Sequence, residues 1–127
     1  MAGTIAADTL THSTAGSIAT NYVVEGSAKH WHTSDGSGTV AIDDSFNTSS
    51  MTDVGTGRYV FSFTNNFSTL NFSPTSNCNS NTASSWGDGG NATYNKTTSQ
   101  YNIGSNNNSG SATDSNFVQV GAWGDLA

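Results

Sequence analysis

The clearest pattern along the chain is an alternation of apolar and polar side chains with a period of two, which is typical of half-buried β-strands. It is strongest over residues 58–64, with the sequence RYVFSFT. Tyr59, Phe61 and Phe63 fall on one face of this predicted strand, and we expect that face to be core. No stretch keeps a helical period, so little helix is expected.

A second strand is predicted over residues 116–123, near the C-terminus. Its apolar side chains project to both sides, with Phe117 and Trp123 on one face and Val118, Val120 and Ala122 on the other. Apolar character on both faces indicates a central strand or a strand at a subunit interface.

The first half of the chain predicts further strands at residues 22–24, 28–32 and 39–42. The last two are expected to form a hairpin around the turn-forming pair Asp35-Gly36. Residues 1–21 are rich in small side chains, and we interpret them as an extended arm that docks on a neighbour. Residues 22–127 are then a single β domain, which fits a chain of 127 residues.

Residues 73–114 differ from the rest of this domain, because Ser, Asn, Thr and Gly dominate them. Pro74, at their start, is expected to end the preceding apolar segment or to confine it to a sheet edge. A polar stretch of this length is too long for a passive loop in a compact domain. It is therefore functional, holds short irregular strands or is partly mobile.

Composition narrows the fold class. Only 33% of the residues are hydrophobic, below the usual share, yet the chain has three Trp, four Tyr and six Phe with a single Pro. Disordered chains are poor in aromatics and rich in Pro, so the composition favours strands joined by polar turns. We expect an all-β fold, an antiparallel β-sandwich or jelly-roll-like module. Because the core of one subunit is thin, we expect a homotrimer.

Charge excludes several classes of partner. The net charge of −6, with three cationic residues, argues against binding to a nucleic-acid backbone. No apolar run is long enough to span a membrane, and the N-terminus does not resemble a secretion signal. Cys78 is the single cysteine, so no internal disulfide is possible, and we expect a buried, neutral thiol.

Four stretches resemble a module found in tail-fibre proteins of marine and freshwater bacteriophages, including cyanophages. They are NYVVEGSAKHW at residues 21–31, GTVAIDDSFN at 38–47, MTDVGTGRYVFSFT at 51–64 and the closing GAWGDLA at 121–127. The resemblance covers about residues 9–72 and the last dozen residues, in order and in turn positions. It implies a structural role in the virion, often at the particle surface. The resemblance does not extend to residues 73–114.

Candidate chemistry is sparse. Asp43 and Asp44 are adjacent, so on a strand they point to opposite faces and cannot pair as acid and base. No Gly-x-Ser-x-Gly motif or other catalytic signature occurs, and we expect no enzyme activity and no cofactor. His30 and His32 share one face of a strand, where three copies around a threefold axis could bind a metal ion. The alternative is that both imidazoles line a hydrated surface.

The loop region offers a candidate sugar site, because aromatic faces stack on sugar rings while amides and carboxylates bind the hydroxyls. Its candidate residues are Trp86, Asp88, Asn91, Tyr94, Asn95 and Tyr101. The alternative is a surface or interface loop whose aromatics pack on the fold.

Together these observations predict a non-enzymatic virion protein, made in the host cytoplasm, that forms a trimeric surface fibre or spike module. Its expected partners are two further copies of itself, other virion proteins and host-surface carbohydrate. The alternative is a capsid decoration protein that cements the phage head.

Overall fold

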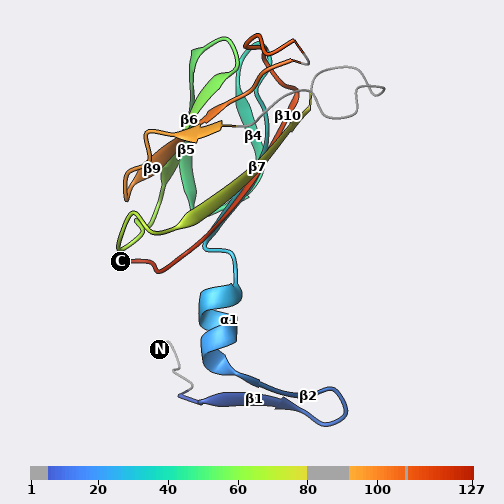
Figure 1. The fold of residues 1–127 in the computed structure, drawn as a ribbon, viewed down its shortest axis with the longest axis vertical. Coiled ribbons are helices and arrows are strands. Elements are labelled where there is room, and N and C mark those ends of the chain that lie inside the picture. The colour runs from blue at the N-terminus through green and yellow to red at the C-terminus, as the bar shows by residue number, and fades with distance from the viewer. Residues whose placement is uncertain (1–5, 80–91, 108) are drawn as a thin grey trace.

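The computed structural model describes residues 6–79, 92–107 and 109–127, in which β-strands dominate (Figure 1). The elements are β1 (Thr9–His12), β2 (Gly16–Ala19), α1 (Thr20–Gly26), β3 (His30–Asp35), β4 (Ala41–Phe46), β5 (Thr48–Gly55), β6 (Arg58–Phe63), β7 (Ser73–Asn79), β8 (Ala92–Tyr94), β9 (Gln100–Gly104) and β10 (Phe117–Trp123).

The strands of the described residues form three sheets, and every pairing is antiparallel. A two-stranded sheet, β1-β2, accompanies two four-stranded sheets with the orders β4-β3-β10-β7 and β5-β6-β9-β8. The all-β class and the β3–β4 hairpin are thereby confirmed. Strand β10 lies between β3 and β7, as the apolar pattern of residues 116–123 indicates.

The two four-stranded sheets enclose one core. β6 and β9 contribute large aromatic and aliphatic side chains from one sheet, and β10 contributes Val118, Val120 and Ala122 from the other. The ring of His32 on β3 lies 4.1 Å from that of Phe61 on β6, centroid to centroid, so the sheets are in direct contact. Tyr59, Phe61 and Phe63 are all buried, which confirms the facing predicted for residues 58–64.

The polar segment 73–114 contains strands rather than one long loop in its described parts. β7, β8 and β9 all fall within it, so the second of the three interpretations is confirmed there. Pro74 lies in β7, at the edge of its sheet, where a missing N–H costs no ladder hydrogen bond on the open side. Tyr101 and Ile103 on β9 alternate with polar residues and are fully buried.

One end of the core is fixed by a buried hydroxyl. The Tyr59 phenol donates to the carbonyl of Gly36 at 3.0 Å and accepts from the N–H of Ser115 at 3.0 Å. Gly57, with φ +63°, sits so close to this end that an added Cβ would lie 2.4 Å from the carbonyl oxygen of Ser105. These contacts fix the turns that flank β3, β6 and β10, so they hold the ends of both sheets together.

The N-terminal part differs from the prediction. Residues 22–24, predicted as a strand, lie in α1, and residues 9–19 form a hairpin rather than an extended arm. Ser27 closes the helix with an N–H bond to the carbonyl of Val23 at 3.2 Å, and the Lys29 ammonium donates to the carbonyl of Val24. The strand prediction was wrong because these backbone groups pair locally, outside both four-stranded sheets.

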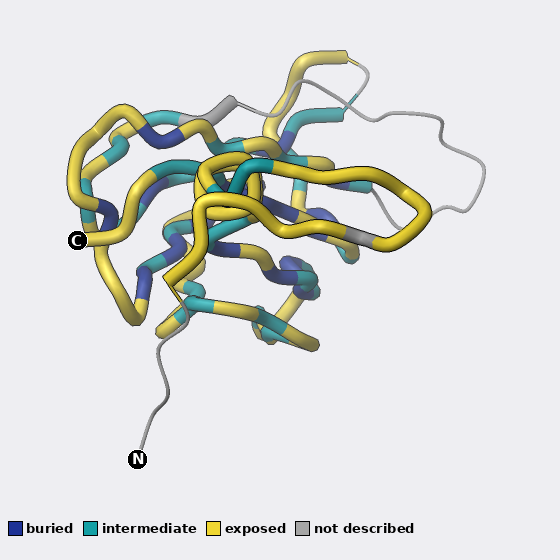
Figure 2. Tube along the Cα trace, turned by 90° about the horizontal axis from the view of Figure 1, so that it is seen from below, coloured by how far each residue is buried: buried dark blue, intermediate teal, exposed yellow. Residues whose placement is uncertain are grey.

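The β1-β2 hairpin and α1 project together from the two sheets (Figure 1). We call residues 6–27 the arm. None of its described side chains is buried, and the arm is yellow along most of its length in Figure 2. No helix in the described ranges is long and apolar enough to cross a membrane.

Candidate functional site

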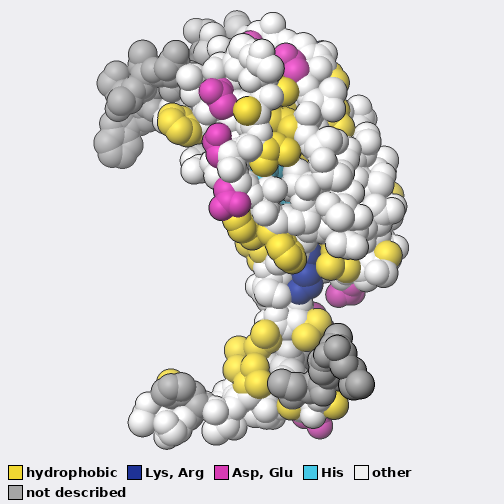
Figure 3. All heavy atoms as spheres, turned by 180° about the vertical axis from the view of Figure 1, so that it is seen from behind, with side chains coloured by type: hydrophobic (Ala, Val, Ile, Leu, Met, Phe, Trp, Pro, Cys, Tyr) yellow, Lys and Arg dark blue, Asp and Glu magenta, His cyan; other side chains and the backbone are white. Residues whose placement is uncertain are grey.

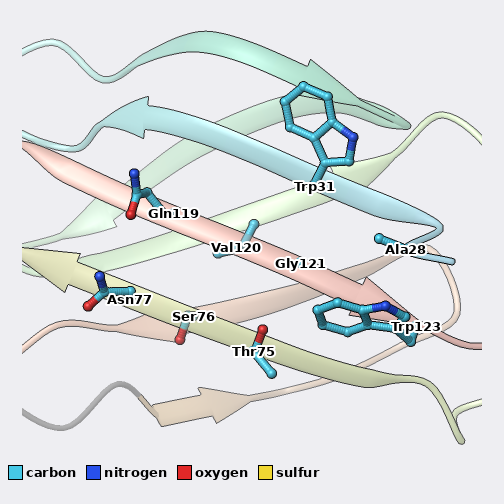
Figure 4. Close-up of a pocket in the computed structure, with 9 residues that line it drawn as sticks. All are labelled: Ala28, Trp31, Thr75, Ser76, Asn77, Gln119, Val120, Gly121 and Trp123. Atoms are coloured by element: carbon cyan, nitrogen blue, oxygen red, sulfur yellow. The ribbon is translucent and has the colours of Figure 1, made fainter. Parts of the chain in front are cut away.

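The outer face of the β4-β3-β10-β7 sheet carries an open groove of about 410 Å³ (Figure 4). We call it the tryptophan groove, because the indoles of Trp31 and Trp123 lie at its sides. Gly121 forms part of the floor of this groove, and Thr75, Asn77 and Gln119 border the groove. Three neighbouring strands therefore build it: β3, β10 and β7.

The strand register explains why these residues meet. Trp31 on β3 pairs with Gly121 on β10, and Gly121 pairs with Thr75 on β7, so the three form one row across the sheet. Gln119 and Asn77 are partners in the next row. Because side chains alternate along a strand, the same register that buries Val118, Val120 and Ala122 turns this set outward.

Gly121 leaves room in the groove for an indole ring. A residue in the middle of a central strand normally carries a side chain over its neighbours, whereas here the row between Trp31 and Thr75 has none at its centre. The benzo ring of Trp123 lies over Gly121 instead: an added Cβ would be 2.9 Å from its Cη2 atom. Glycine inside a strand often marks a close approach of another group.

The groove is neutral and has hydrogen-bonding capacity. None of the described residues that line it is charged. The side chains of Asn77, Gln119 and Thr75 are exposed. A carboxamide offers two donors and two acceptor lone pairs, and a hydroxyl offers both functions. An apolar wall beside such groups can stack a flat apolar surface and bind hydroxyls at the same time.

The two histidines proposed as metal ligands lie in the core. His30 and His32 are buried, with ring centroids 5.4 Å apart, and they contact Phe61, Phe63 and Tyr101. They face the opposite sheet of their own subunit, so they cannot reach a shared ion on a threefold axis. That hypothesis is therefore not supported, and the described residues contain no cluster of three or more metal-ligating side chains.

Burial also changes the acid–base behaviour of this pair. Loss of hydration lowers the pKa of His30 to about 4 and that of His32 to about 3, and for His32 the neighbouring His30 lowers it further. The ring of His30 is hydrogen-bonded to Thr48 at 3.0 Å, whereas neither ring nitrogen of His32 has a partner among the described residues. Both imidazoles are thus neutral near pH 7.

The sugar-site residues predicted in the loop do not form one described site. Trp86, Asp88 and Asn91 lie outside the described residues. Tyr94 is half-buried on β8, and Asn95 follows it as an exposed residue with φ 48°. Tyr101 was assigned to the site wrongly: it is fully buried, packs against Phe61, Phe63 and Phe72, and cannot meet a ligand at the surface.

The single cysteine behaves as the sequence predicts. Cys78 is buried on the inner side of β7, and loss of hydration raises the pKa of its thiol to about 11. The thiol is therefore protonated at neutral pH and is not an activated nucleophile.

Comparison of the chain with protein-family models, with curated proteins and with solved structures gave no match.

Sequence reasoning missed the tryptophan groove, although a signal was present. Trp123 was placed on the face opposite Val118, Val120 and Ala122, which is correct. Trp31 alternates with His30 and His32, so once those two are inside, the indole must be outside. What the sequence did not reveal is that β3 and β10 are neighbours, which brings the two indoles together.

Proposed function

We propose that this chain is a non-enzymatic structural module of the bacteriophage particle surface, a β-sandwich that works as a homotrimer in a fibre or spike. Contact with host-surface carbohydrate is part of the same proposal. The resemblance of residues 9–72 and of the C-terminus to tail-fibre modules supports the location, and the arm supports the assembly.

The arm is the observation that carries the proposal. Leu10, Ile18, Tyr22, Val23 and Val24 are all exposed on it, and Tyr22 keeps 67% of its surface accessible. Hydrophobic side chains gather on this projection in the space-filling view (Figure 3). A run of exposed apolar residues on a projecting element is typical of a segment that packs against another subunit or protein.

Lys29 ties the arm to the sheets. Its ammonium donates to Ser27 and to the end of α1, while its backbone N–H donates to the carbonyl of Ala122 on β10 at 2.8 Å. Because the junction is hydrogen-bonded on both sides, it favours one direction of projection. A pre-set direction suits docking in a symmetric assembly, since less conformational freedom is lost on association.

The mass of the purified protein in solution tests the trimer. Light scattering during size-exclusion chromatography should give three times the chain mass of 13.1 kDa. A folded monomer that persists at micromolar concentration would contradict the trimer.

The arm favours a second candidate equally, a capsid decoration protein whose arm docks on the shell. Quantifying the chain in purified particles separates the two. Hundreds of copies per particle indicate decoration of the head, whereas a few copies, in multiples of three, indicate a fibre or spike.

A further inference from the structure

We infer that the tryptophan groove binds a neutral oligosaccharide. This inference deepens the proposed function, since it places the carbohydrate contact on the β3-β10-β7 face rather than in the loop that contains Trp86. It depends on the proposed contact with sugar but not on the oligomeric state or the place in the particle.

The two indoles supply the apolar part of the site. Trp31 is 39% exposed although its strand lies inside the sheet, and Trp123 is half-buried over Gly121. Trp31 and Trp123 are diagonal neighbours in the antiparallel register, a relation in which residues lie about 7–8 Å apart. Indoles at this spacing on one face can contact the apolar sides of a single bound chain of sugar rings.

The amide row supplies the polar part. Asn77 and Gln119 lie side by side, Thr75 lies next along β7, and all three project from the same face as the indoles (Figure 4). No hydrogen bond joins the side chain of Asn77 or Gln119 to another described residue. These groups can therefore donate to and accept from ligand hydroxyls without breaking an existing contact.

The neutral lining of the groove and the net negative charge of the chain limit the class of ligand that the groove can bind. The described lining residues carry no charge, and the chain as a whole has a net charge of −6. An anionic sugar would be repelled by this field, and a cationic ligand would find no carboxylate in the groove to pair with. The central strand of the groove, β10, has already paired on both sides with β3 and β7, so it offers no free backbone groups to a peptide. An uncharged polyol with apolar ring faces fits best.

The missing side chain at Gly121 gives the sharpest test. Gly121→Val places a β-branched residue, which strands favour, on the floor of the groove and pushes Trp123 aside. The matched control is Phe117→Val, on the same strand and the same outward face, 55% exposed and outside the groove. Both variants should fold, as followed by circular dichroism.

Isothermal titration calorimetry should use the purified protein with neutral probes, namely cellohexaose, maltohexaose and chitohexaose, and with heparin as the anionic probe. We expect at least one neutral probe to bind and heparin not to bind. Gly121→Val, Trp31→Ala and Trp123→Ala should each weaken the binding by about tenfold or more, equivalent to about 1.4 kcal/mol. Phe117→Val and Trp86→Ala should bind as the wild type does.

Three outcomes would overturn the inference. In the first, none of the neutral probes binds. In the second, Trp86→Ala abolishes binding while the groove variants retain it, which returns the site to the loop. In the third, the groove variants change the oligomeric mass instead of sugar affinity, which shows that a second subunit covers the groove. The proposed virion role is tested separately, by the copy number of the chain in purified particles. A negative result in the sugar titrations therefore contradicts the sugar site and leaves the virion role to be judged by that copy number.

Discussion

His30 and His32 introduce two imidazoles into a core made of Phe, Tyr and aliphatic side chains. The rings serve as packing surfaces, since His30 lies edge-on to Phe63 at 4.9 Å and His32 lies tilted against Phe61. A titratable group that faces His30 from the opposite sheet is Tyr101, whose hydroxyl is 3.4 Å from Nδ1 of His30. Burial raises the pKa of that phenol, so it offers no anion to offset a protonated imidazole.

The domain should therefore lose stability in mild acid. The folded pKa values of about 4 and about 3 lie below the unfolded value of 6.5, so between these limits the unfolded chain binds more protons. The free energy of unfolding should be level between about pH 7 and about pH 8, since at higher pH the buried thiol and phenols, whose pKa values are raised by folding, ionise first in the unfolded chain. Below about pH 6.5 it should fall by about 1.4 kcal/mol for each pH unit of acidification and each imidazole. Urea unfolding at a series of pH values measures this slope.

His32→Leu is the comparison that isolates the effect. Its ring nitrogens have no partner among the described residues, so an aliphatic side chain of similar volume breaks no hydrogen bond to them. The variant should be at least as stable at pH 7 and should show about half the slope between about pH 6.5 and 5, where ordinary carboxylates stay ionised. An unchanged slope in the variant would mean that other groups cause the acid loss.

Phe61 tests the facing of β6. It is fully buried and contacts His32, Tyr59 and Tyr101, whereas the neighbouring Ser62 points to the other side and is half-buried. Phe61→Ala should cost about 3–5 kcal/mol of unfolding free energy, the usual range for a deleted core aromatic. Ser62→Ala should be nearly silent in the same urea titration. Equal losses would show that the strand faces are assigned wrongly.

At the scale of the elements, β6 and β10 could be predicted from the sequence, because their alternation places several apolar side chains in the core. The β3–β4 hairpin followed from its turn residues instead, since the buried side chains of β3 are His30, His32 and Ser34. β5 and β7 could not be predicted, because each is a sheet edge with few inward apolar residues, among them Met51 and Cys78. Edge strands with polar exposed faces carry almost no period in hydrophobicity.

The arm shows a different limit of sequence reasoning. Tyr22, Val23 and Val24 have high strand propensity, yet they form the middle of α1. Propensity is a weak prior that local pairing overrides. Here the hairpin before the helix holds its start, since the N–H of Thr20 donates to the carbonyl of Asp8 at 2.9 Å and its hydroxyl donates to Ala7 at 2.7 Å.

The candidate site depends on pairing between distant segments, which no local pattern encodes. The tryptophan groove joins residues 31, 75–77 and 119–123, and its shape follows from Gly121 lying opposite Trp31. The sugar-site prediction combined aromatic residues with amides, as the tryptophan groove does, but it included Tyr101. That residue was misplaced because β9 alternates, and Tyr101 falls on the inner face with Ile103.

At the scale of the whole molecule, the chain has two parts. The body consists of the two four-stranded sheets and the core between them, and the arm contributes no described side chain to that core. Backbone hydrogen bonds fix the C-terminus of the body against the loop after β6. The N–H of Ser68 donates to the carbonyl of Asp125, and the N–H of Ala127 donates to the carbonyl of Asn66. The large apolar side chains of the arm, in contrast, stay exposed. Leu10 and Val24 instead line a second hollow of about 500 Å³ between the hairpin and α1.

If that hollow is filled by a neighbouring subunit, polar substitutions there should break the assembly and leave the body folded. Leu10 and Val24 are 47% and 60% exposed, and burying the exposed part of each in an interface would contribute about 1 kcal/mol per side chain. The double variant Leu10→Ser, Val24→Ser should therefore elute as a monomer by light scattering, with the β-type circular dichroism of the wild type. Ser13→Ala, an exposed change in the hairpin turn, is the matched control and should remain a trimer. A double variant that keeps the trimer mass would place the subunit contact on the body instead, where Phe46 and Phe117 are the exposed aromatics to substitute next.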